Sequence, residues 1–320
     1  MMVEGTNNIC KFTTFNCKNF KSSIDDIRKL CNCSNLICLQ ETWLFNHDIP
    51  LLGTVSPDFE YTGKSAIDSG ELLIGRPYGG VAILWRKGVF NNVSVIECSS
   101  SRLIAINASV DGRSVLVFSV YMPTKSRHNL PIFTEVLSEI NAIVESNNTQ
   151  TVFILGDMNA HPGQLFYSEL SSFCGERSWL CADVEFLGFD SSSFTFYDTY
   201  HGTGSWLDHC VVSQAAWQTV VNVGIVEDIF VSDHLPIFLE SKLGDIKPVI
   251  ATPDVPRSAI RWGERDKRQI ARFQILCNEG LRSVDFPEDF TKCAYGSCNL
   301  YEHTIVLDKM YTKLICHILK

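Results

Sequence analysis

Short runs of β-branched and other apolar residues recur along the first 245 residues, separated by segments rich in turn-forming residues. Runs of this length and composition are typical of β-strands. Two stretches between them have helical spacing instead, so the chain is restricted to a layered α/β arrangement. The predicted strands lie at residues 12–15, 36–39, 80–85, 103–110, 114–121, 151–155, 210–212 and 237–240.

The two helical stretches are amphipathic. In the first, Ser22 and Ser23 are candidate caps, and the second opens at Pro131, a residue favoured in the first helical turn. Strands before and after such helices predict two sheets with helices on their outer faces. The apolar positions expected to face inward are Ile24, Ile27, Leu30 and Cys31 in the first helix, and Phe133, Val136, Leu137, Ile140 and Val144 in the second.

Composition excludes several classes of protein. With 320 residues, 45% of them hydrophobic and 20% charged, the chain is expected to fold rather than to remain disordered. Its apolar runs are far shorter than the ~20 residues that span a bilayer, so we expect no membrane association. The 13 cysteines are odd in number and follow no signal sequence, which favours reduced thiols in an intracellular protein.

A domain boundary is expected near residue 245. Prolines at 248, 253 and 256 indicate a linker, and the stretch after it is basic and helical in pattern. We therefore predict a catalytic domain at 1–245 and a Pro-containing linker with a basic, partly helical tail at 246–320. The net charge of −9 argues against strong nucleic-acid binding, but the excess of acidic residues lies in the first region.

Polar residues follow several of the predicted strands directly. Asn16, Glu41 and Tyr121 each end such a run, and Asp157 and Asn159 follow another. A strand fixes the position of the residue after it, and the loop exposes that residue. A single acidic residue in this place is more often a solvated turn or a helix cap than a ligand.

Two further polar clusters each precede an apolar run: residues 204–209, with Asp208, and residues 231–236, with Asp233 and His234. Carboxylate and amide oxygens bind Mg²⁺, and histidine transfers protons or contacts phosphate. Asn and Tyr donate hydrogen bonds to developing negative charge. The combined set points to metal-assisted phosphodiester hydrolysis.

Seven motifs in this order resemble the endonuclease/exonuclease/phosphatase family. They are Phe15-Asn16, Leu39-Gln40-Glu41-Thr42, Gly79-Gly80-Val81-Ala82, Val120-Tyr121-Met122-Pro123, Gly156-Asp157-Met158-Asn159-Ala160, Ser205-Trp206-Leu207-Asp208 and Ser232-Asp233-His234 with Pro236. The resemblance covers residues 10 to 243. It implies a four-layer α/β sandwich of two mixed β-sheets flanked by helices, with Mg²⁺ or Mn²⁺ in a cleft at one end of the sheets.

The resemblance also implies roles for individual residues. Glu41, helped by Asn16, would bind the metal, and Asp233 would approach a second metal position. Catalysis would fall to Asp157 and Asn159, which orient the attacking water or leaving oxygen, to His234 with its partner Asp208, and to Tyr121 on the phosphate. Lys18 is expected to contact the substrate phosphate, and Thr195 and Ser205 are expected either to contact the DNA or to support the residues that bind the metal and the phosphate.

Two positions depart from the family pattern. After Asn16 the family usually has small or acidic residues followed by Gly, whereas this chain has Cys17-Lys18-Asn19. A metal role at position 18 is therefore in doubt, and the charge of Lys18 favours a phosphate contact instead. Thr124 replaces the Asn that usually follows the Tyr-x-Pro motif, so a substrate hydrogen bond there is expected to differ.

The segments around residues 15–22 and 40–44, with the basic stretch after 245, look like the endonuclease domain of a non-LTR (LINE-type) retrotransposon polyprotein. This predicts an enzyme that nicks double-stranded DNA and leaves a 3′ hydroxyl primer. Its expected location is the nucleus, with the cytoplasm as the alternative. Its other partners would be the reverse-transcriptase part of the same polyprotein and the element RNA. Three alternatives stay open: an abasic-site repair nuclease, a small-phosphoester or lipid phosphatase, and an inactive decayed element.

Overall fold

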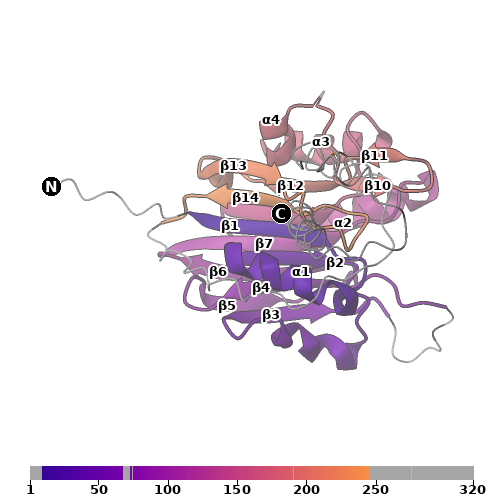
Figure 1. The fold of residues 1–320 in the computed structure, drawn as a ribbon. Helices are drawn as coiled ribbons and strands as arrows, with labels where there is room; N and C mark the ends of the chain where they lie inside the picture. Colours follow the sequence, from indigo (N-terminus) through magenta and orange to yellow (C-terminus); the bar gives the residue numbers. More distant parts are fainter. Residues whose placement is uncertain (1–8, 68–72, 74, 190, 245–274, 276–320) are drawn as a thin grey trace, which may run out of the picture. The chain divides into compact units, whose positions relative to one another are not determined.

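The protein is described by a computed structural model that covers residues 9–67, 73, 75–189, 191–244 and 275. Two six-stranded sheets and one two-stranded hairpin, β10–β11, form its β-structure (Figure 1). The first sheet has the strand order β13-β14-β1-β2-β4-β3, and the second has the order β5-β6-β7-β8-β12-β9. The expected linker and tail at 246–320 lie outside the described residues, apart from residue 275.

The first sheet comprises β1 (Cys10–Asn16), β2 (Leu36–Gln40), β3 (Phe59–Lys64), β4 (Val81–Arg86), β13 (Val220–Ile225) and β14 (Ile237–Ser241). The second comprises β5 (Asn91–Ile96), β6 (Leu103–Val110), β7 (Arg113–Tyr121), β8 (Thr151–Asp157), β9 (Leu180–Cys181) and β12 (Asp208–Val212). The hairpin consists of β10 (Phe196–Asp198) and β11 (Thr203–Ser205). The helices are α1 (Phe20–Cys33), α2 (Leu130–Asn147), α3 (Leu165–Glu176), α4 (Ala182–Leu187) and α5 (Gln214–Trp217), with short 3-10 helices η1 (Asn46–Thr54) and η2 (Arg127–Asn129).

Both large sheets are mixed. β1 runs parallel to β2, and β7 runs parallel to β8, whereas the other paired strands of the two sheets are antiparallel. Parallel neighbours bring their carboxyl ends to the same edge of a sheet. Polar residues that follow these strands are therefore gathered at one end of each sheet.

The main core lies between the sheets. Its centre includes Phe12 of β1 and Phe153 of β8, whose rings stack with their centroids 4.5 Å apart. Both side chains are fully buried, and burial of a Phe contributes about 1.5–3 kcal/mol. These contacts join the inner faces of the two sheets, so that the strand ends of one sheet are fixed relative to those of the other.

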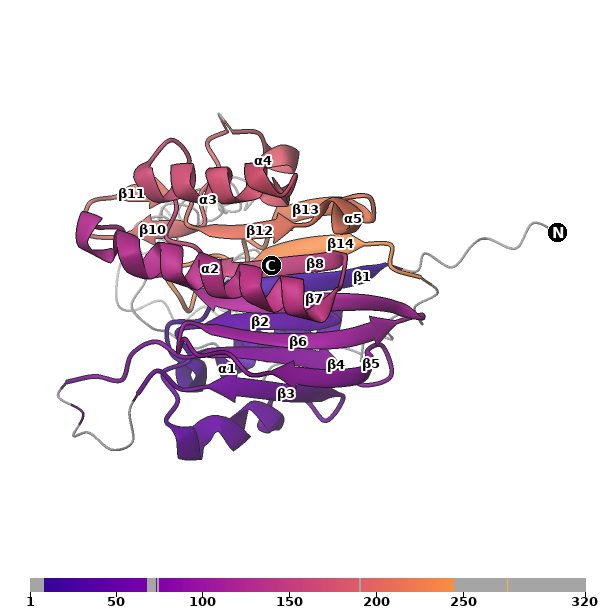
Figure 2. The same cartoon turned by 180° about the vertical axis from the view of Figure 1, so that it is seen from behind.

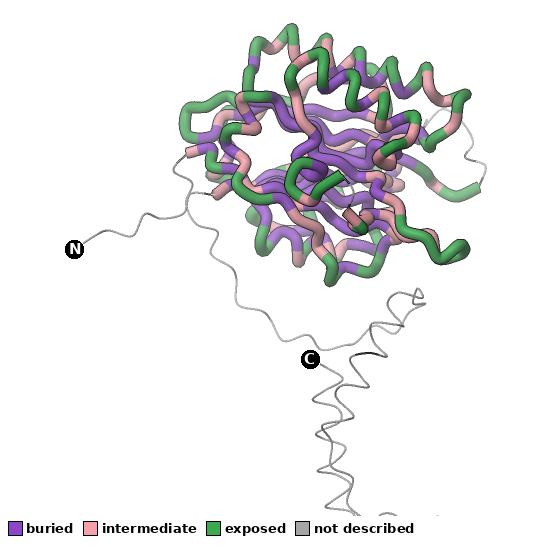
Figure 3. Tube along the Cα trace, turned by 90° about the horizontal axis from the view of Figure 1, so that it is seen from above, coloured by how far each residue is buried: buried purple, intermediate pink, exposed green. Residues whose placement is uncertain are grey.

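Helices cover the outer faces. α1 packs Ile27 and Leu30 against the first sheet, and α2 and α3 pack against the second, with Phe133 and Phe166 in contact at 4.4 Å between centroids (Figures 1 and 2). The buried positions follow the strands, and the helices expose one face (Figure 3). The predicted four-layer sandwich is confirmed.

The local predictions need correction at the two helices. α1 begins at Phe20, and Asn19 rather than Ser22 or Ser23 is its cap, because the Asn19 side chain accepts a hydrogen bond from the Lys21 amide. The two serine hydroxyls bond instead to earlier backbone carbonyls. Ile24 is only partly buried; in α2, Val144 is partly buried too, and Ile143 takes the buried position.

Several elements were missed by the sequence patterns. β3, β5 and β13 are edge strands in which most positions are exposed or only partly buried, so they lack an apolar run. α3 follows a loop, α4 follows β9 directly, and neither has a side-chain hydrogen bond at its N-cap. No helix in the described ranges has both the length and the apolar character needed to cross a membrane.

Candidate active site

The site begins where the two parallel strand pairs end. Asn16 lies opposite Gln40 in the β1–β2 register, which places Glu41 just past the same edge. In the second sheet, Tyr121 lies opposite Asp157. The Asn16 amide nitrogen donates to Glu41 Oε1 at 3.0 Å and to Asp157 Oδ2 at 2.9 Å. One fully buried amide therefore joins a carboxylate of each sheet.

Glu41 occupies a turn that only a specific local backbone permits. Its φ is 52°, in the left-handed region, and the indole Nε1 of Trp43 donates to its Oε2 at 3.1 Å. Gly80, with φ of 86°, lies against the turn: a Cβ there would be 2.5 Å from Thr42 Oγ1. Gly79 and Gly80 accept the Trp43 and Thr42 amides, so this glycine pair supports the Glu41 turn.

Asp157 is placed by a close approach of two strands. Gly156 precedes it in β8, and a Cβ at Gly156 would lie 2.0 Å from the Val120 carbonyl oxygen of β7. No larger residue fits at that position without moving a strand. Asp157 Oδ1 accepts the amide of Asn159, which has φ of 49°, and the Asn159 side chain donates to the Met122 carbonyl, each at 2.9 Å.

His234 and Asp208 form a buried pair beside Asp157. The Nδ1 of His234 lies 2.7 Å from Asp208 Oδ2, and its Nε2 lies 3.8 Å from Asp157 Oδ2. The hydroxyl of Ser232 accepts the His234 amide and donates to the Asn16 carbonyl. The loop before β14 is thereby joined to the end of β1.

Burial and neighbouring charges shift the pKa values of His234 and Asp157. Burial lowers the pKa of His234, but the carboxylates of Asp208 and Asp157 outweigh burial and raise that pKa to about 10. Burial raises the pKa of Asp157 to about 7, against the opposing effect of His234. Near neutral pH, His234 is therefore an imidazolium and Asp157 is close to its titration point.

Tyr121 lies at the rim of the same group. Burial raises the pKa of its phenol, and the neighbouring carboxylates of Glu41 and Asp157 add to the effect. The guanidinium of Arg102 lies 5.6 Å from the ring centre. Tyr121 thus remains a neutral hydroxyl that can donate a hydrogen bond.

Four predicted residues lie around this centre. The buried Thr195 hydroxyl accepts the amides of Leu207 and Asp208, at 2.9 and 3.0 Å, so it holds Asp208 in place. Ser205 ends β11, and its carbonyl accepts the Thr195 amide. Lys18 and Asp233 form an ion pair with each other, with 43% and 25% of their side chains exposed. A metal role for Asp233 and substrate contacts for the other three stay predictions.

The donor set suits a hard divalent cation. One ligand atom each from Asp157, Asp208 and His234 lie within 4.8 Å of one another, and Glu41 shares the Asn16 amide with Asp157. Asp208 Oδ1 is buried with no hydrogen-bond partner among the described residues. An unpartnered carboxylate oxygen beside a second carboxylate, that of Asp157, is a ligand environment suited to a hard divalent cation such as Mg²⁺ or Mn²⁺.

Sequence reasoning missed the supporting residues. Trp43 is adjacent to the quoted Glu41 motif, but its indole hydrogen bond depends on the left-handed turn. Ser232 belongs to the last of the seven motifs, but the sequence gives no sign that its hydroxyl joins His234 to Asn16. A buried pair of His209 and Asp183 had no signal for Asp183, which lies in a helix that the patterns did not predict.

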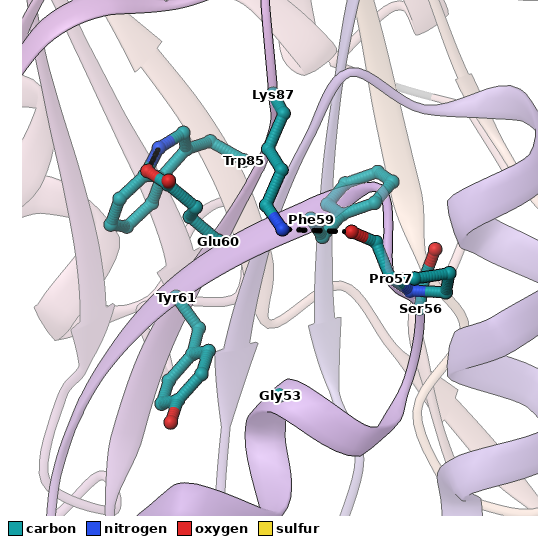
Figure 4. A pocket seen from close by; sticks show the side chains of 8 residues that line it. All are labelled: Gly53, Ser56, Pro57, Phe59, Glu60, Tyr61, Trp85 and Lys87. Atoms are coloured by element: carbon teal, nitrogen blue, oxygen red, sulfur yellow. Dashed lines mark hydrogen bonds between the residues drawn. The ribbon is translucent and has the colours of Figure 1, made fainter.

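A separate cavity of about 360 Å³ opens at the edge strand β3, with Tyr61 and Trp85 among its walls (Figure 4). Lys87 Nζ donates to the Pro57 carbonyl, and Trp85 Nε1 donates to Glu60. Trp85 lies opposite Leu36, at the start of β2, whereas Glu41 follows the end of that strand. The cavity is therefore at the other end of the sheet from the carboxylate cluster.

Solved structures share this fold at low sequence identity. The AP endonuclease LMAP from Leishmania major is 13% identical, with a TM-score of 0.60 over 75% of this chain and 92% of that one. An AP endonuclease from Archaeoglobus fulgidus is 18% identical, with a TM-score of 0.56 over 72% and 98%. The 3′ phosphatase NExo from Neisseria, bound to a product DNA hairpin, is 17% identical, with a TM-score of 0.54 over 72% and 99%.

The curated proteins gave no match to the sequence. A family model does match, over residues 13–234, which include Asn16, Glu41, Asp157 and His234. The matched range also spans the strand ends at which these side chains meet. The chain belongs to the Endonuclease/Exonuclease/phosphatase family.

Proposed function

We propose that this protein is a metal-dependent endonuclease that nicks one strand of duplex DNA and leaves a 3′ hydroxyl. The observation that carries the proposal is the Asn16 amide, which bridges Glu41 and Asp157 next to the buried His234–Asp208 pair. Carboxylates for a metal, an Asp with a pKa near 7 and a cationic His are groups that can carry out metal-assisted phosphodiester hydrolysis.

Glu41 and Asn16 are the residues that would hold the cation, with Mg²⁺ the ion proposed. When bound, the cation would supply Lewis-acid stabilisation of the charge that develops on the phosphate. Glu41 is oriented for this by the Trp43 indole and by the Asn16 amide, which fix its two oxygens separately. The chain thus presents a carboxylate with a defined orientation.

Asp157 and His234 take different parts in the proton chemistry. Asp157, with a pKa of about 7, is suited to accept the proton of the attacking water. His234 Nδ1 carries a proton and donates a hydrogen bond to Asp208, and Nε2 carries a second proton, so His234 donates to a phosphate oxygen rather than acting as the base. Asn159 and Tyr121 supply further hydrogen bonds at the same place.

The β10–β11 hairpin is our candidate for contacting the DNA groove. Its strand β10 is joined to the site, because the Tyr197 amide donates to the Asp233 carbonyl and the Phe196 ring lies 5.0 Å from the His234 ring. At its tip, Tyr200 is 86% exposed. Lys125 and Arg127, beyond the end of β7, are proposed contacts to the DNA backbone.

We also propose that the domain belongs to a LINE-type retrotransposon polyprotein and acts on nuclear DNA. The support is the set of motifs around Asn16 and Glu41 and the excess of basic over acidic residues at 246–320. Its further partners would then be the reverse-transcriptase region of the same polyprotein and the element RNA. Nicking that leaves a 3′ hydroxyl would provide the primer for reverse transcription.

The test is conversion of supercoiled plasmid to open circle by the full chain with Mg²⁺. We expect open circles that disappear with EDTA and with Glu41→Ala, Asp157→Ala or His234→Ala. Extension of the nick by a DNA polymerase would report the 3′ hydroxyl. Retained nicking by all three variants would contradict the assignment of the site.

Oligonucleotide substrates separate the alternatives within the family. A duplex with an abasic-site analogue, a duplex with a 3′ phosphate and a small phosphoester are compared with an intact duplex under the same conditions. Preference for the intact duplex or plasmid supports the proposed endonuclease. Cleavage confined to the abasic duplex, or phosphate release without nicking, would replace it with a repair or phosphatase activity.

A further inference from the structure

A second His–Asp pair lies directly behind the site, on the other face of β12. His209 follows Asp208, and successive side chains in a strand point to opposite faces. The Nδ1 of His209 lies 2.7 Å from Asp183 Oδ2, and its Nε2 lies 2.7 Å from the Ala160 carbonyl oxygen. Both side chains are fully buried.

The partners determine which atoms of His209 carry protons. A carbonyl oxygen accepts only, and an ionised carboxylate accepts only, so both ring nitrogens donate. The other oxygen of Asp183 accepts the Cys210 amide at 2.8 Å. The pair is thus an imidazolium and a carboxylate whose polar atoms are occupied, with Trp206 and Tyr167 packed around the ring.

This pair is connected through one atom, the Ala160 carbonyl oxygen, to the loop of residues 157–160, which carries Asp157 and Asn159. Ala160 follows Asn159, which itself takes a left-handed conformation two residues after Asp157. The same loop is held from the other side by the Met158 amide, which donates to the Leu207 carbonyl at 2.9 Å. The imidazolium therefore fixes the end of the loop, and Leu207, just before β12, holds its other side.

A buried ion pair is a costly way to fill a core. Removing two charges from water costs several kcal/mol, and apolar residues of the same volume often stabilise a fold as well or better. The hydrogen bond from Nε2, however, is charge-assisted and directional, and an apolar side chain cannot replace it. Directional support of the loop is what distinguishes this pair from ordinary core packing.

We propose that His209 is a positioning residue: with Asp183 it holds the Ala160 carbonyl and thereby the placement of Asn159 and Asp157. The inference rests on the proposed function for its consequence in catalysis, but its structural part does not depend on any activity. Loss of the donor is expected to loosen residues 157–160 while leaving the rest of the fold intact.

The test compares His209→Leu, which loses both donors, with His209→Gln, whose side-chain amide can still donate to Ala160. Hydrogen exchange of the full chain is measured at the Met158 and Asn159 amides and at the β7 and β1 amides. We expect exchange at 158 and 159 to increase tenfold or more in the Leu variant, less in the Gln variant, and not in β7 or β1. His47→Gln, at an exposed position, is the matched control.

Kinetics provide the second measurement. A misplaced loop should lower kcat roughly 10- to 100-fold with KM nearly unchanged, and the Gln variant should recover part of that loss. If the Leu variant does not fold, Asp183→Asn replaces it: the ring loses its charged partner but, as a neutral imidazole, can still donate from Nε2 to Ala160, so a loss close to that of the Gln variant is expected. Two results would overturn the proposal: equal acceleration of exchange at residues 158 and 159 and in strands β7 and β1, or unchanged exchange at residues 158 and 159. If the wild type nicks nothing, the proposed function falls while the exchange pattern still decides this inference.

Discussion

The Asp208 carboxylate holds the Nδ1 of His234 at 2.7 Å, and both side chains are almost completely buried. The pair sets the orientation of the ring and thereby the direction in which Nε2 can donate, on the side of the ring that faces Asp157. We expect Asp208→Asn to lower kcat by on the order of 10²- to 10⁴-fold, because the ring loses its charged partner. Steady-state nicking on a single-site duplex measures this, with Asp25→Asn, in the exposed Asp25–Arg28 ion pair of α1, as the control. A decrease of less than threefold would mean that the pair is structural.

The pH dependence of nicking should have two limbs. Activity should increase as pH passes about 7, because Asp157 must lose its proton to act as a base, and should decrease as pH passes about 10, because His234 loses its positive charge. In Asp208→Asn, the descending limb should move to lower pH, since Asp208 raises the pKa of His234. Rates from pH 5 to 11 at constant ionic strength test both limbs, and a descending limb that does not move would contradict the assignment.

Asp157→Asn should abolish activity and at the same time stabilise the folded protein. The pKa of Asp157 is raised in the folded state, so its charged form opposes folding, and this cost is absent at low pH and complete above pH 7. The variant should therefore raise Tm at pH 8 to 9, by roughly 2–4 °C for each kcal/mol gained, with little change at pH 4. Metal-free thermal unfolding at both pH values measures this. An unchanged or lowered Tm at pH 8 to 9 would show that the buried charge carries no such cost.

The ion pair with Lys18 should weaken the binding of a cation by the Asp233 carboxylate. The two side chains form an ion pair, so the ammonium competes with any metal for that carboxylate. We expect Lys18→Gln to bind Mn²⁺ roughly 3- to 10-fold more tightly than the wild type, because a positive charge is removed and the Asp233 oxygens become available. Mn²⁺ titration followed by EPR is the measurement, and Lys21→Gln, from the exposed Lys21–Asp48 pair, is the control. Equal affinities would separate Asp233 from the metal site.

Gly156 and Gly175 offer a matched pair of Gly→Ala substitutions. A Cβ at Gly156 would lie 2.0 Å from the Val120 carbonyl oxygen, so Gly156→Ala must displace β7 or β8 and with it Asp157. We expect it to destabilise the fold by about 2 kcal/mol or more and to lower nicking. At Gly175, in α3, a Cβ meets nothing within 4 Å, so Gly175→Ala should be neutral or stabilising by up to about 1 kcal/mol. Urea unfolding of both variants tests the contrast, which would fail if the two behaved alike.

The sequence by itself predicted the layers of the fold and a set of candidate site residues. The apolar runs mark the central strands, because buried strands need consecutive apolar residues, and the polar residues after them mark the site. It could not show the edge strands β3, β5 and β13, whose exposed and partly buried positions have no such pattern. It also misplaced the α1 cap, since Asn19 and the two serines are all good capping residues and only packing selects among them.

Only the tertiary structure decided how those residues act together. The Asn16 bridge between Glu41 and Asp157 joins positions 25 and 141 residues away in the chain, and it exists because the two sheets pack with their strand ends aligned. The same holds for Lys18 with Asp233, for Thr195 beneath Asp208 and for the His209–Asp183 pair. Such contacts depend on sheet register and on distances across the core, which local composition and spacing do not specify, because many arrangements of the same strands would satisfy the same pattern.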